Sequence, residues 1–292
     1  MMITIRREGD EWAEGIDTSK ELVRECTLSA PEILARIKEA GIVGMGGAAF
    51  PTQVKLTVPA GKKVEHLIIN GVECEPYLTS DHRVMLERSE ELLVGVTILM
   101  RALGVSGASI GIENNKPDAI ARLSRLAPVV PRNPVVPLRV RYPQGGEKQL
   151  IAAVTGREVP PPPGLPIDVG AVVCNVSTTV AVYDAVQKNK PLIERVVTVT
   201  GRQMELRKIC SSVSERRWLS CWRLRERAAG DVKVLNGGPM MGRAMSNLAS
   251  PVVKGCSGIT VLGGAAACVV GRAPVSNAPN ACRPARWDWS LI

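Results

Sequence analysis

The chain has 292 residues, a formal net charge of +9 and 45% hydrophobic residues, a composition typical of folded globular proteins rather than disordered ones. Its apolar runs are shorter than the roughly 20 residues of a membrane-spanning helix, and its N-terminus lacks the apolar stretch of a secretory signal. We therefore predict no membrane span, and a cytoplasmic location in which the eight cysteines are reduced.

The excess positive charge is concentrated in two stretches. Residues 202–231 contain eight Lys or Arg against four Asp or Glu, and residues 265–292 contain three Arg against one Asp. These stretches carry net charges of +4 and +2, so the rest of the chain is nearly neutral. Because a nucleic-acid-binding domain presents a basic face of its own, we predict no nucleic-acid partner for this chain.

Strands and helices are predicted to alternate over the first 185 residues. A helix is expected over residues 29–41, with Pro31 in its first turn and Gly41 at its end. A loop, "GVECEPYLTSDHR", is expected over residues 71–83. The remaining predicted elements are strands over 64–70, 108–115 and 137–143, and helices over 89–104 and 116–127. This alternation predicts an α/β fold with a parallel sheet.

A proline-rich stretch separates this unit from the next part of the chain. Residues 156–166, "GREVPPPPGLP", predict a rigid extended loop. Residues 169–190 then predict a strand, a polar turn over Asn175 to Thr178, and a helix. A half-buried strand over residues 195–201 begins a second, smaller unit, which closes on "KVLNGGPMMG".

The most unusual stretch is "GIVGMGGAAFPTQVKL", residues 41–56. Gly44, Gly46 and Ala49 match the dinucleotide-binding pattern G-x-G-x-x-A, which requires a strand before it and a helix after it. Here a predicted helix precedes the pattern, and Pro51 follows it. The order disfavours an ordinary dinucleotide-binding loop. A glycine cluster that serves only a tight turn remains an alternative.

Six motifs occur in the order seen in one protein family. They are "GMGGAAFPTQVKL", "INGVECEPYLTSDHR", "YPQGGEKQLI", "TGREVPPPPGLP", "VVCNVSTT" and "NGGPMMG". Together they resemble the RnfC family, the C subunits of Rnf ion-translocating electron-transport complexes, and the related NADH-oxidising flavoprotein subunit of respiratory complex I. The resemblance implies a Rossmann-like FMN-binding domain with a parallel sheet, followed by a small β-grasp domain of the soluble-ligand-binding type.

The resemblance also implies bound FMN and NAD(H). It places FMN against Gly44, Gly46 and Gly47 with Lys55 beside them, and it makes Phe50 the platform on which the nicotinamide stacks. The other implied cofactor-binding residues are Asn70, Glu73, Gly146, Glu147, Asn175 and Thr178. Taken alone, these residue types have ordinary roles as well: a turn former for Asn70, a solvated acid for Glu73 and a surface lysine for Lys55.

The implied function is electron transfer between NAD(H) and an Rnf-type membrane complex through FMN, which makes the chain an NADH-dependent oxidoreductase subunit without a catalytic side chain. Its implied partners are the other subunits of that complex, and its implied place is the inner face of the cell membrane. Three alternatives stay open: a cobalamin-reductase-like flavoprotein, a proline-reductase-associated flavoprotein, and a non-catalytic nucleotide-binding fragment.

The chain departs from the family pattern in several places. We expect residues 1–27 to be the remnant of a barrel-sandwich domain, 28–190 the FMN/NAD(H)-binding domain, and 191–243 the β-grasp domain. Residues 201–231 and the tail 244–292 are expected to be aberrant. The tail lacks the family's C-x-x-C-x-x-C-x-x-x-C-P runs, so we predict no metal site although the family carries [4Fe-4S] clusters.

We explain these aberrant stretches by two reading-frame shifts, one compensated between residues 201 and 231 and one uncompensated after residue 262. Both stretches are rich in Arg, Cys, Trp and Ser, as an out-of-frame GC-rich gene would produce. The alternative is a divergent basic insert that docks on a membrane or a partner.

Overall fold

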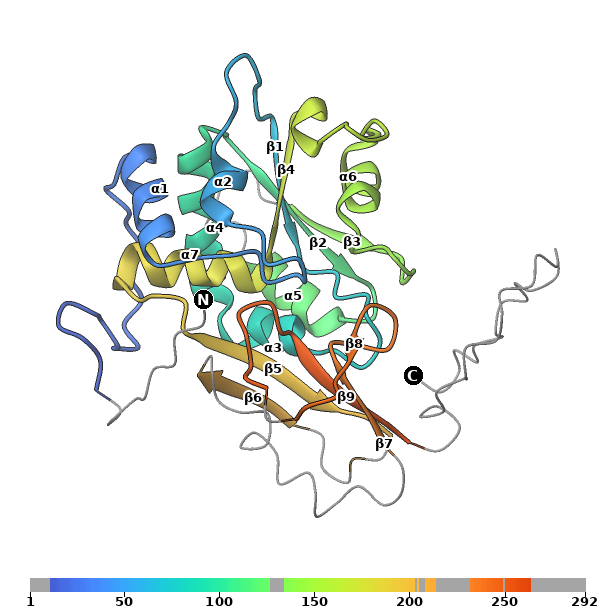
Figure 1. The fold of residues 1–292 in the computed structure, drawn as a ribbon. Coiled ribbons are helices and arrows are strands. Elements are labelled where there is room, and N and C mark those ends of the chain that lie inside the picture. Colours follow the sequence, from blue (N-terminus) through green and yellow to red (C-terminus); the bar gives the residue numbers. More distant parts are fainter. Residues whose placement is uncertain are drawn as a thin grey trace.

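The computed structural model describes residues 11–126, 134–202, 204, 208–213, 232–248 and 250–263. Within them the chain forms two sheets, with a layer of helices on each face of the first (Figure 1). The first sheet is wholly parallel, as predicted, and its strands follow the order β3-β2-β1-β4. Its strands are β1 (His66–Asn70), β2 (Ala108–Glu113), β3 (Val135–Leu138) and β4 (Ala171–Asn175).

The central strand β1 is buried on both faces of this sheet. Leu67 and Ile69 point into the larger apolar core, whereas Ile68 points into a smaller core on the opposite face. A strand covered on both sides reads as a continuous apolar run, which is why the sequence signal for β1 was strong.

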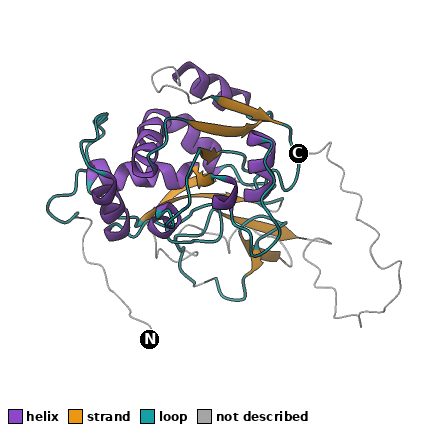
Figure 2. Cartoon of the chain, turned by 90° about the horizontal axis from the view of Figure 1, so that it is seen from above, coloured by secondary structure: helices purple, strands orange, loops and turns teal. Residues whose placement is uncertain are grey.

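Helices cover the two faces of the parallel sheet unequally. The larger core receives side chains from α1 (Ala30–Glu39), α4 (Ser89–Leu103), α5 (Pro117–Leu126) and α7 (Val176–Lys188). The smaller core is covered by α6 (Glu147–Thr155) and the 3-10 helix η2 (Pro166–Val169), on the right of the sheet in Figure 1. Figure 2 shows the same layers from above.

The predicted helices over 29–41, 89–104 and 116–127 and the predicted strands over 64–70 and 108–115 are confirmed within a few residues. The third strand exists, but the bounds predicted for it, 137–143, are wrong, because β3 begins at Val135 and ends at Leu138. In the register of the sheet Leu138 lies opposite Glu113, the last residue of β2. Beyond it the chain has no neighbouring strand to pair with, although its apolar alternation continues.

Three short helices were missed. They are α2 (Thr52–Leu56), α3 (Ser80–Glu87) and α6, of which α3 includes residues predicted as loop. The polar turn predicted over Asn175 to Thr178 is also wrong. Asn175 is instead the N-cap of α7, and its side-chain oxygen accepts hydrogen bonds from the backbone N–H groups of Ser177 (2.9 Å) and Thr178 (3.2 Å). A polar residue at this position starts a helix by satisfying its free donors.

The second sheet has the strand order β6-β5-β9-β7-β8. Its strands are β5 (Glu194–Thr200), β6 (Lys208–Val213), β7 (Val232–Asn236), β8 (Arg243–Ala244) and β9 (Gly258–Gly263). Because β9 lies between β5 and β7, this sheet extends beyond residue 243, where we predicted the second domain to end. The division into domains stays a prediction. The assignment of this unit as a β-grasp domain stays a prediction.

Most of the stretches predicted to be aberrant lie outside the described residues, so the hypothesis of two frame shifts stays a prediction. Among the described residues of these stretches, 208–213 form β6, which pairs antiparallel with β5, and 250–263 contain β9.

The second sheet is joined to the first unit by side chains of the loop after β1. Glu75 accepts hydrogen bonds from the backbone N–H groups of Met240 (2.7 Å) and Met241 (3.0 Å), in the turn between β7 and β8. The backbone N–H of Thr79, just before α3, donates to the hydroxyl of Thr198 in β5 (3.0 Å). The second sheet is therefore held against the end of β1.

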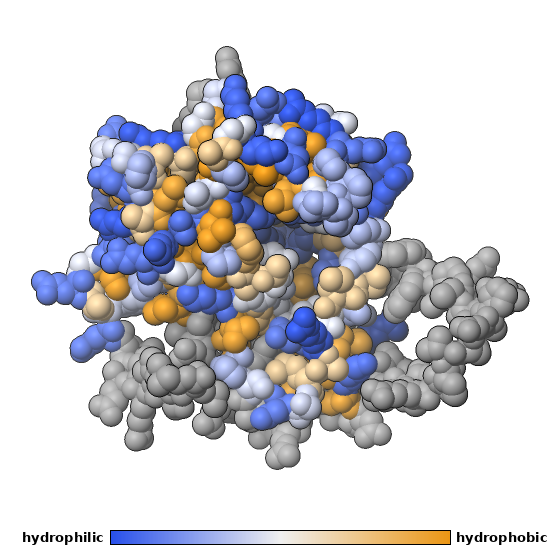
Figure 3. All heavy atoms as spheres, turned by 45° about the horizontal axis from the view of Figure 1, so that its top comes forward, coloured by the Kyte–Doolittle hydropathy of each residue, from blue (hydrophilic) through white to orange (hydrophobic). Residues whose placement is uncertain are grey.

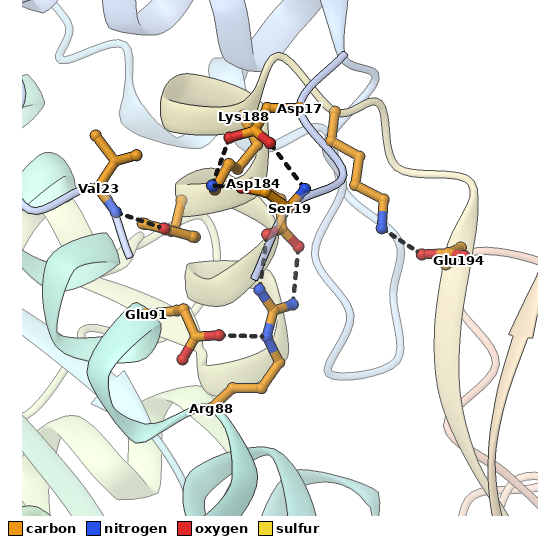
Figure 4. A network of polar contacts seen from close by, with 10 residues as sticks. Asp17, Ser19, Val23, Arg88, Glu91, Asp184, Lys188 and Glu194 are labelled. Carbon is orange, nitrogen blue, oxygen red and sulfur yellow. Dashed lines mark hydrogen bonds and ion pairs between the residues drawn. The ribbon is translucent and has the colours of Figure 1, made fainter. Parts of the chain in front are cut away.

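The segment before α1 lies against α7, as Figure 4 shows. The ammonium of Lys188 donates to the carboxylate of Asp17 (2.5 Å). Arg88 joins the start of α4 to α7 through two hydrogen bonds to Asp184 (2.9 and 2.7 Å). Residues 11–27 thus pack on the unit that begins at residue 28, and their derivation from a barrel-sandwich domain stays a prediction.

Across the face shown in Figure 3, apolar residues gather in several separate groups among hydrophilic ones. Within the part of the chain that the structure describes, no helix combines the length and the apolar character needed to cross a membrane.

A close contact between α4 and α7 yields a test of the fold. A Cβ added at Gly95 in α4 would lie 2.3 Å from the backbone oxygen of Thr179. In a helix with free space, Gly→Ala raises the free energy of unfolding by about 1 kcal/mol. At Gly95 the clash should reverse this effect, and we expect Gly95→Ala to lower the free energy of unfolding by about 1–3 kcal/mol. Urea denaturation measures the difference.

The matched control is Gly111→Ala in β2, where the nearest atom is the flexible end of Leu150 at 3.0 Å. It should cost less than Gly95→Ala. A Gly95→Ala protein as stable as the wild type would contradict the packing of these two helices.

Candidate functional site

A cavity of about 300 Å³ opens beside the glycine-rich stretch. Its walls include ten of the eleven predicted cofactor-binding residues, all except Glu73. The lining residues are Gly44, Gly46, Gly47, Ala48, Ala49, Phe50, Thr52, Lys55, Asn70, Gly145, Gly146, Glu147, Val173, Cys174, Asn175 and Thr178.

The cavity lies at the carboxyl ends of β1 and β4. From β1 the chain continues to β2 and β3 on one side, then returns to place β4 on the other side. The last residues of the two neighbouring strands, Asn70 and Asn175, are opposite each other. Ligands of open parallel sheets bind at such a switch in strand order, because the loops after the two strands diverge there.

The glycine-rich stretch forms a closed loop between α1 and α2. Its two ends are tied by hydrogen bonds from the Gly44 N–H to the Phe50 carbonyl (2.8 Å) and from the Thr52 N–H to the Ile42 carbonyl (3.1 Å). Gly47 has a φ of +133°, which residues with a side chain rarely adopt. The backbone itself thus requires glycine at this position.

Gly46 is different, because the protein leaves room for a side chain there. A Cβ at Gly46 would lie 3.6 Å from the Cβ of Asn175, an ordinary van der Waals distance. Its φ is not in the left-handed region. Neither backbone conformation nor packing explains this glycine, and its place on the cavity wall points to a ligand that approaches the backbone.

Lys55 and Glu147 form an ion pair across the cavity, between α2 and the first residue of α6. The ammonium of Lys55 lies 2.7 Å from Glu147 Oε1 and donates a second hydrogen bond to the Val173 carbonyl (3.0 Å). Both side chains are about one-third exposed, at 35% and 38%, so water weakens their attraction. The pair leaves charged groups of both signs available at the cavity.

Asn70 and Thr178 hold the loops around the cavity in place. The side-chain amide of Asn70 donates to the Gly145 carbonyl (2.9 Å), and its oxygen accepts from the Val72 N–H (3.2 Å). The Thr178 hydroxyl accepts a hydrogen bond from the backbone N–H of Met45 (2.8 Å). Asn70 is therefore a turn former, as its residue type alone suggests, and it also borders the cavity.

Glu73 does not reach the cavity wall. Its carboxylate accepts hydrogen bonds from the backbone N–H groups of Asp81 (2.8 Å) and His82 (3.0 Å) in the first turn of α3. The prediction that it contacts the cofactor is therefore not supported by its position, and the reading as a solvated acid is wrong as well. Burial and the neighbouring Asp81 carboxylate raise the pKa of Glu73 to about 7.

Sequence reasoning missed two charged residues behind the cavity, the partly buried Asp81 and the buried Arg195. Asp81 accepts hydrogen bonds from the Asn175 amide (2.7 Å) and the Ser177 hydroxyl (2.5 Å) at the start of α7. Arg195 on β5 is 3% exposed and donates to the carbonyls of Cys256 (2.9 Å) and Met45 (3.3 Å). A charged residue inside an apolar strand was the available signal for Arg195.

The two cysteines beside the cavity are neutral thiols. Burial raises the pKa of Cys174 to about 11, and it also raises the pKa of Cys74, whose sulfur accepts a hydrogen bond from the Gly145 N–H (3.3 Å). Thiols in such surroundings are poor nucleophiles. Over the described ranges, no group of three or more His, Cys, Asp or Glu side chains is placed to hold a metal ion.

Comparison with known proteins gives three kinds of match. The family model described as the Nuo51 FMN-binding domain matches residues 37–184, half of the chain. The chain is 49% identical over 263 residues to the C subunit of the proton-translocating ferredoxin:NAD(+) oxidoreductase complex of Clostridium ljungdahlii, covering 88% of this chain and 56% of that protein. It is 40% identical to the Na(+)-translocating counterpart of Acetobacterium woodii, covering 86% of this chain and 57% of that protein.

A third relative, the C subunit of the ion-translocating oxidoreductase complex of Rhodobacter capsulatus, is 42% identical over 89% of this chain and 50% of its own length. The chain thus spans about half the length of these relatives. Among solved structures, it resembles a chain of an NAD+-reducing [NiFe]-hydrogenase in the air-oxidized state, with a TM-score of 0.66. That match is 22% identical, covers 80% of this chain and 46% of the other, and shows the fold alone.

The raised pKa of Glu73 predicts how stability depends on pH. The folded-state pKa of about 7 exceeds the ordinary value of 4.5, so the folded protein binds more protons between these values. The stabilisation is fully present below about pH 4.5 and is lost as pH rises through about 7. Between about pH 5 and 8, the wild type should lose up to about 3 kcal/mol of unfolding free energy relative to Glu73→Gln.

Urea denaturation of both proteins at several pH values measures this difference. The control is Glu87→Gln in α3, which removes an exposed carboxylate. That carboxylate forms an ion pair with Arg83. Parallel pH profiles for the wild type and Glu73→Gln would show that Glu73 is ionised throughout.

Proposed function

We propose that this chain, which belongs to the RnfC family of ion-translocating oxidoreductase subunits, binds FMN in the cavity between β1 and β4 and exchanges electrons with NAD(H) there. Membership of this family is the starting point of the proposal. The FMN site, the substrate NAD(H) and the partner subunits are proposed for this chain.

Gly46 is the observation that carries the proposal. It lines the cavity at the switch in strand order, and neither its φ nor the space around it requires glycine. A flat ring system that lies against the backbone explains the missing side chain, since a side chain at Gly46 would occupy the same space. The matching family model is named for FMN binding, in agreement with such a ligand.

The other lining residues suit a flavin mononucleotide. The backbone of the glycine loop supplies N–H groups and close approach for the ligand. Lys55 provides a positive charge on the cavity wall, Thr178 fixes the loop against α7 through its bond to Met45, and Asn175 caps α7 beside it. When bound, FMN would accept a hydride and release single electrons, a conversion that amino-acid side chains do not perform.

Phe50 is suited to bind the nicotinamide nucleotide. It is the only phenylalanine in the sequence, it lines the cavity, and it is 50% exposed. A half-exposed ring at the edge of a cavity offers one face to a stacking partner from solution. We assign Phe50 to NAD(H) and the glycine loop to FMN.

The partners proposed for this chain are the other subunits of an Rnf-type complex, and its proposed place is the inner face of the membrane that holds them. The relatives are named as subunits of ion-translocating complexes. The cysteine runs that hold [4Fe-4S] clusters in the family are absent from these 292 residues, so the proposal is restricted to FMN and NAD(H).

Gly46→Leu tests the FMN site. Because a Cβ at Gly46 meets only ordinary van der Waals contacts and the residue lines the cavity, the free energy of unfolding without FMN should change by less than about 1 kcal/mol, whereas the Kd for FMN should rise at least about 10-fold. Fluorescence titration with FMN and urea denaturation measure the two quantities.

Val54→Leu places the same leucine side chain on the exposed side of α2, outside the cavity, and should change neither quantity. If Gly46→Leu binds FMN as the wild type does, the ligand does not lie against Gly46, and the cradle proposed here is refuted.

Anaerobic titration with NADH tests the redox function. The FMN-loaded protein should be yellow and should bleach with NADH. Phe50→Ala should raise the NADH concentration for half-bleaching by about 2- to 10-fold, since an aromatic stacking pair contributes about 0.5–1.5 kcal/mol. Phe50→Tyr keeps a ring and should stay close to the wild type. An FMN-loaded protein that NADH never bleaches would favour a non-catalytic nucleotide-binding module.

A further inference from the structure

The glycine loop between α1 and α2 has a front that faces the cavity and a back that faces the protein. Gly44, Gly46 and Gly47 line the cavity. Met45, which lies between the first two, is 4% exposed and packs in the larger apolar core. The contacts of Met45 therefore help to fix how the front of the loop is presented to a ligand.

Arg195, on β5 of the second sheet, holds Met45 from behind. Its guanidinium donates to the Met45 carbonyl (3.3 Å) and to the Met45 sulfur (3.0 Å). The same group donates to the carbonyl of Cys256 (2.9 Å), in the segment that leads into β9. Arg195 is 3% exposed, so bulk water does not compete for these bonds. One side chain thus ties the glycine loop to two parts of the second sheet.

The segment before β9, residues 251–257, meets the glycine-rich stretch at two further places. The ammonium of Lys254 donates to the carbonyl of Gly41 (2.7 Å), directly after α1, where a positive charge is favourable. A Cβ added at Gly255 would lie only 3.3 Å from the Cβ of Ala49, which lines the cavity. Because the φ of Gly255 is not in the left-handed region, the close approach of the loop explains this glycine.

Stability alone does not account for a buried arginine at this place. The cost of removing a cation from water offsets its attraction to neighbouring carboxylates, and an apolar side chain of similar length would fill the space without that cost. A guanidinium adds direction, because its donors lie in one rigid plane. What Arg195 provides is a fixed position for the groups that it bonds, and one of these is the backbone between Gly44 and Gly46 on the cavity wall.

We propose that Arg195 and Lys254 are positioning residues of the FMN site: from the second sheet they hold the back of the glycine loop and thereby set the affinity of its front for FMN. The inference rests on the proposed function, in which FMN occupies the cavity. Both residues act through the loop. The second sheet thus has a role in cofactor binding, and the motif of the loop alone does not contain the whole site.

Arg195→Met and Lys254→Met test the inference, because each removes a charged donor and keeps an unbranched side chain. In each variant the Kd for FMN should rise about 2- to 30-fold, the range expected for residues that affect a site without contacting its ligand. Fluorescence titration of the full chain with FMN measures the Kd, and urea denaturation without FMN shows whether each variant is folded. If Arg195→Met does not fold, the half-buried Lys254 decides the outcome through Lys254→Met.

Two further variants are the controls. Lys254→Arg keeps a cationic donor for the Gly41 carbonyl and should keep the Kd for FMN within about 2-fold of the wild type. Thr198→Val, also on β5, removes the hydroxyl that accepts from the Thr79 N–H (3.0 Å). It weakens the contact between the second sheet and the first unit at the start of α3 rather than at the glycine loop. It should therefore leave the Kd unchanged, even where it lowers the free energy of unfolding.

An unchanged Kd in either folded methionine variant would overturn the role assigned to that residue. An equal rise of the Kd in Thr198→Val would overturn the inference as a whole, because the affinity would then follow the stability of the second sheet and not its hold on the loop. A wild-type protein that binds no FMN would overturn the proposed function together with this inference, whereas normal wild-type binding with unchanged variants would overturn the inference alone.

Discussion

The parallel pairing of β1 with β4 brings Asn70 next to Asn175 and opens a gap between the loops that leave the two strands. The strand order creates this gap, because β2 and β3 lie on one side of β1 and β4 on the other. The glycine loop packs over it through the bond from Met45 to Thr178. The cavity is therefore a property of the strand order, and the glycine loop forms one of its walls.

The polar groups around the cavity are almost all satisfied by one another, which holds the walls in a fixed arrangement. Lys55 bonds to Glu147, and Asn70 bonds to Gly145. A site built in this way does not have to reorganise before a ligand binds, which lowers the entropic cost of binding. The open space at Gly46, which this network leaves unexplained, lies on the same cavity.

Behind the cavity, the buried Arg195 connects the second sheet to the glycine loop. Arg195 on β5 reaches the Met45 carbonyl, and Asp81 holds Asn175 and Ser177. Buried charges contribute little net stability, because their desolvation offsets their attraction. Their effect here is positional: a shift of β5 would move the loop that lines the cavity. The second sheet therefore helps to hold the glycine loop in its position on the cavity wall.

The sequence alone determined features that depend on local pattern: the buried runs of β1 and β2, the amphipathic helix α1, and the glycine, lysine and phenylalanine of the loop. Tertiary structure decided the rest. β3 ends at Leu138 because β2 ends opposite it, and Glu73 turns away from the cavity because the first turn of α3 offers it two N–H donors. The set of residues that line the cavity depends on a strand order that brings distant segments together, and a short motif cannot encode that information.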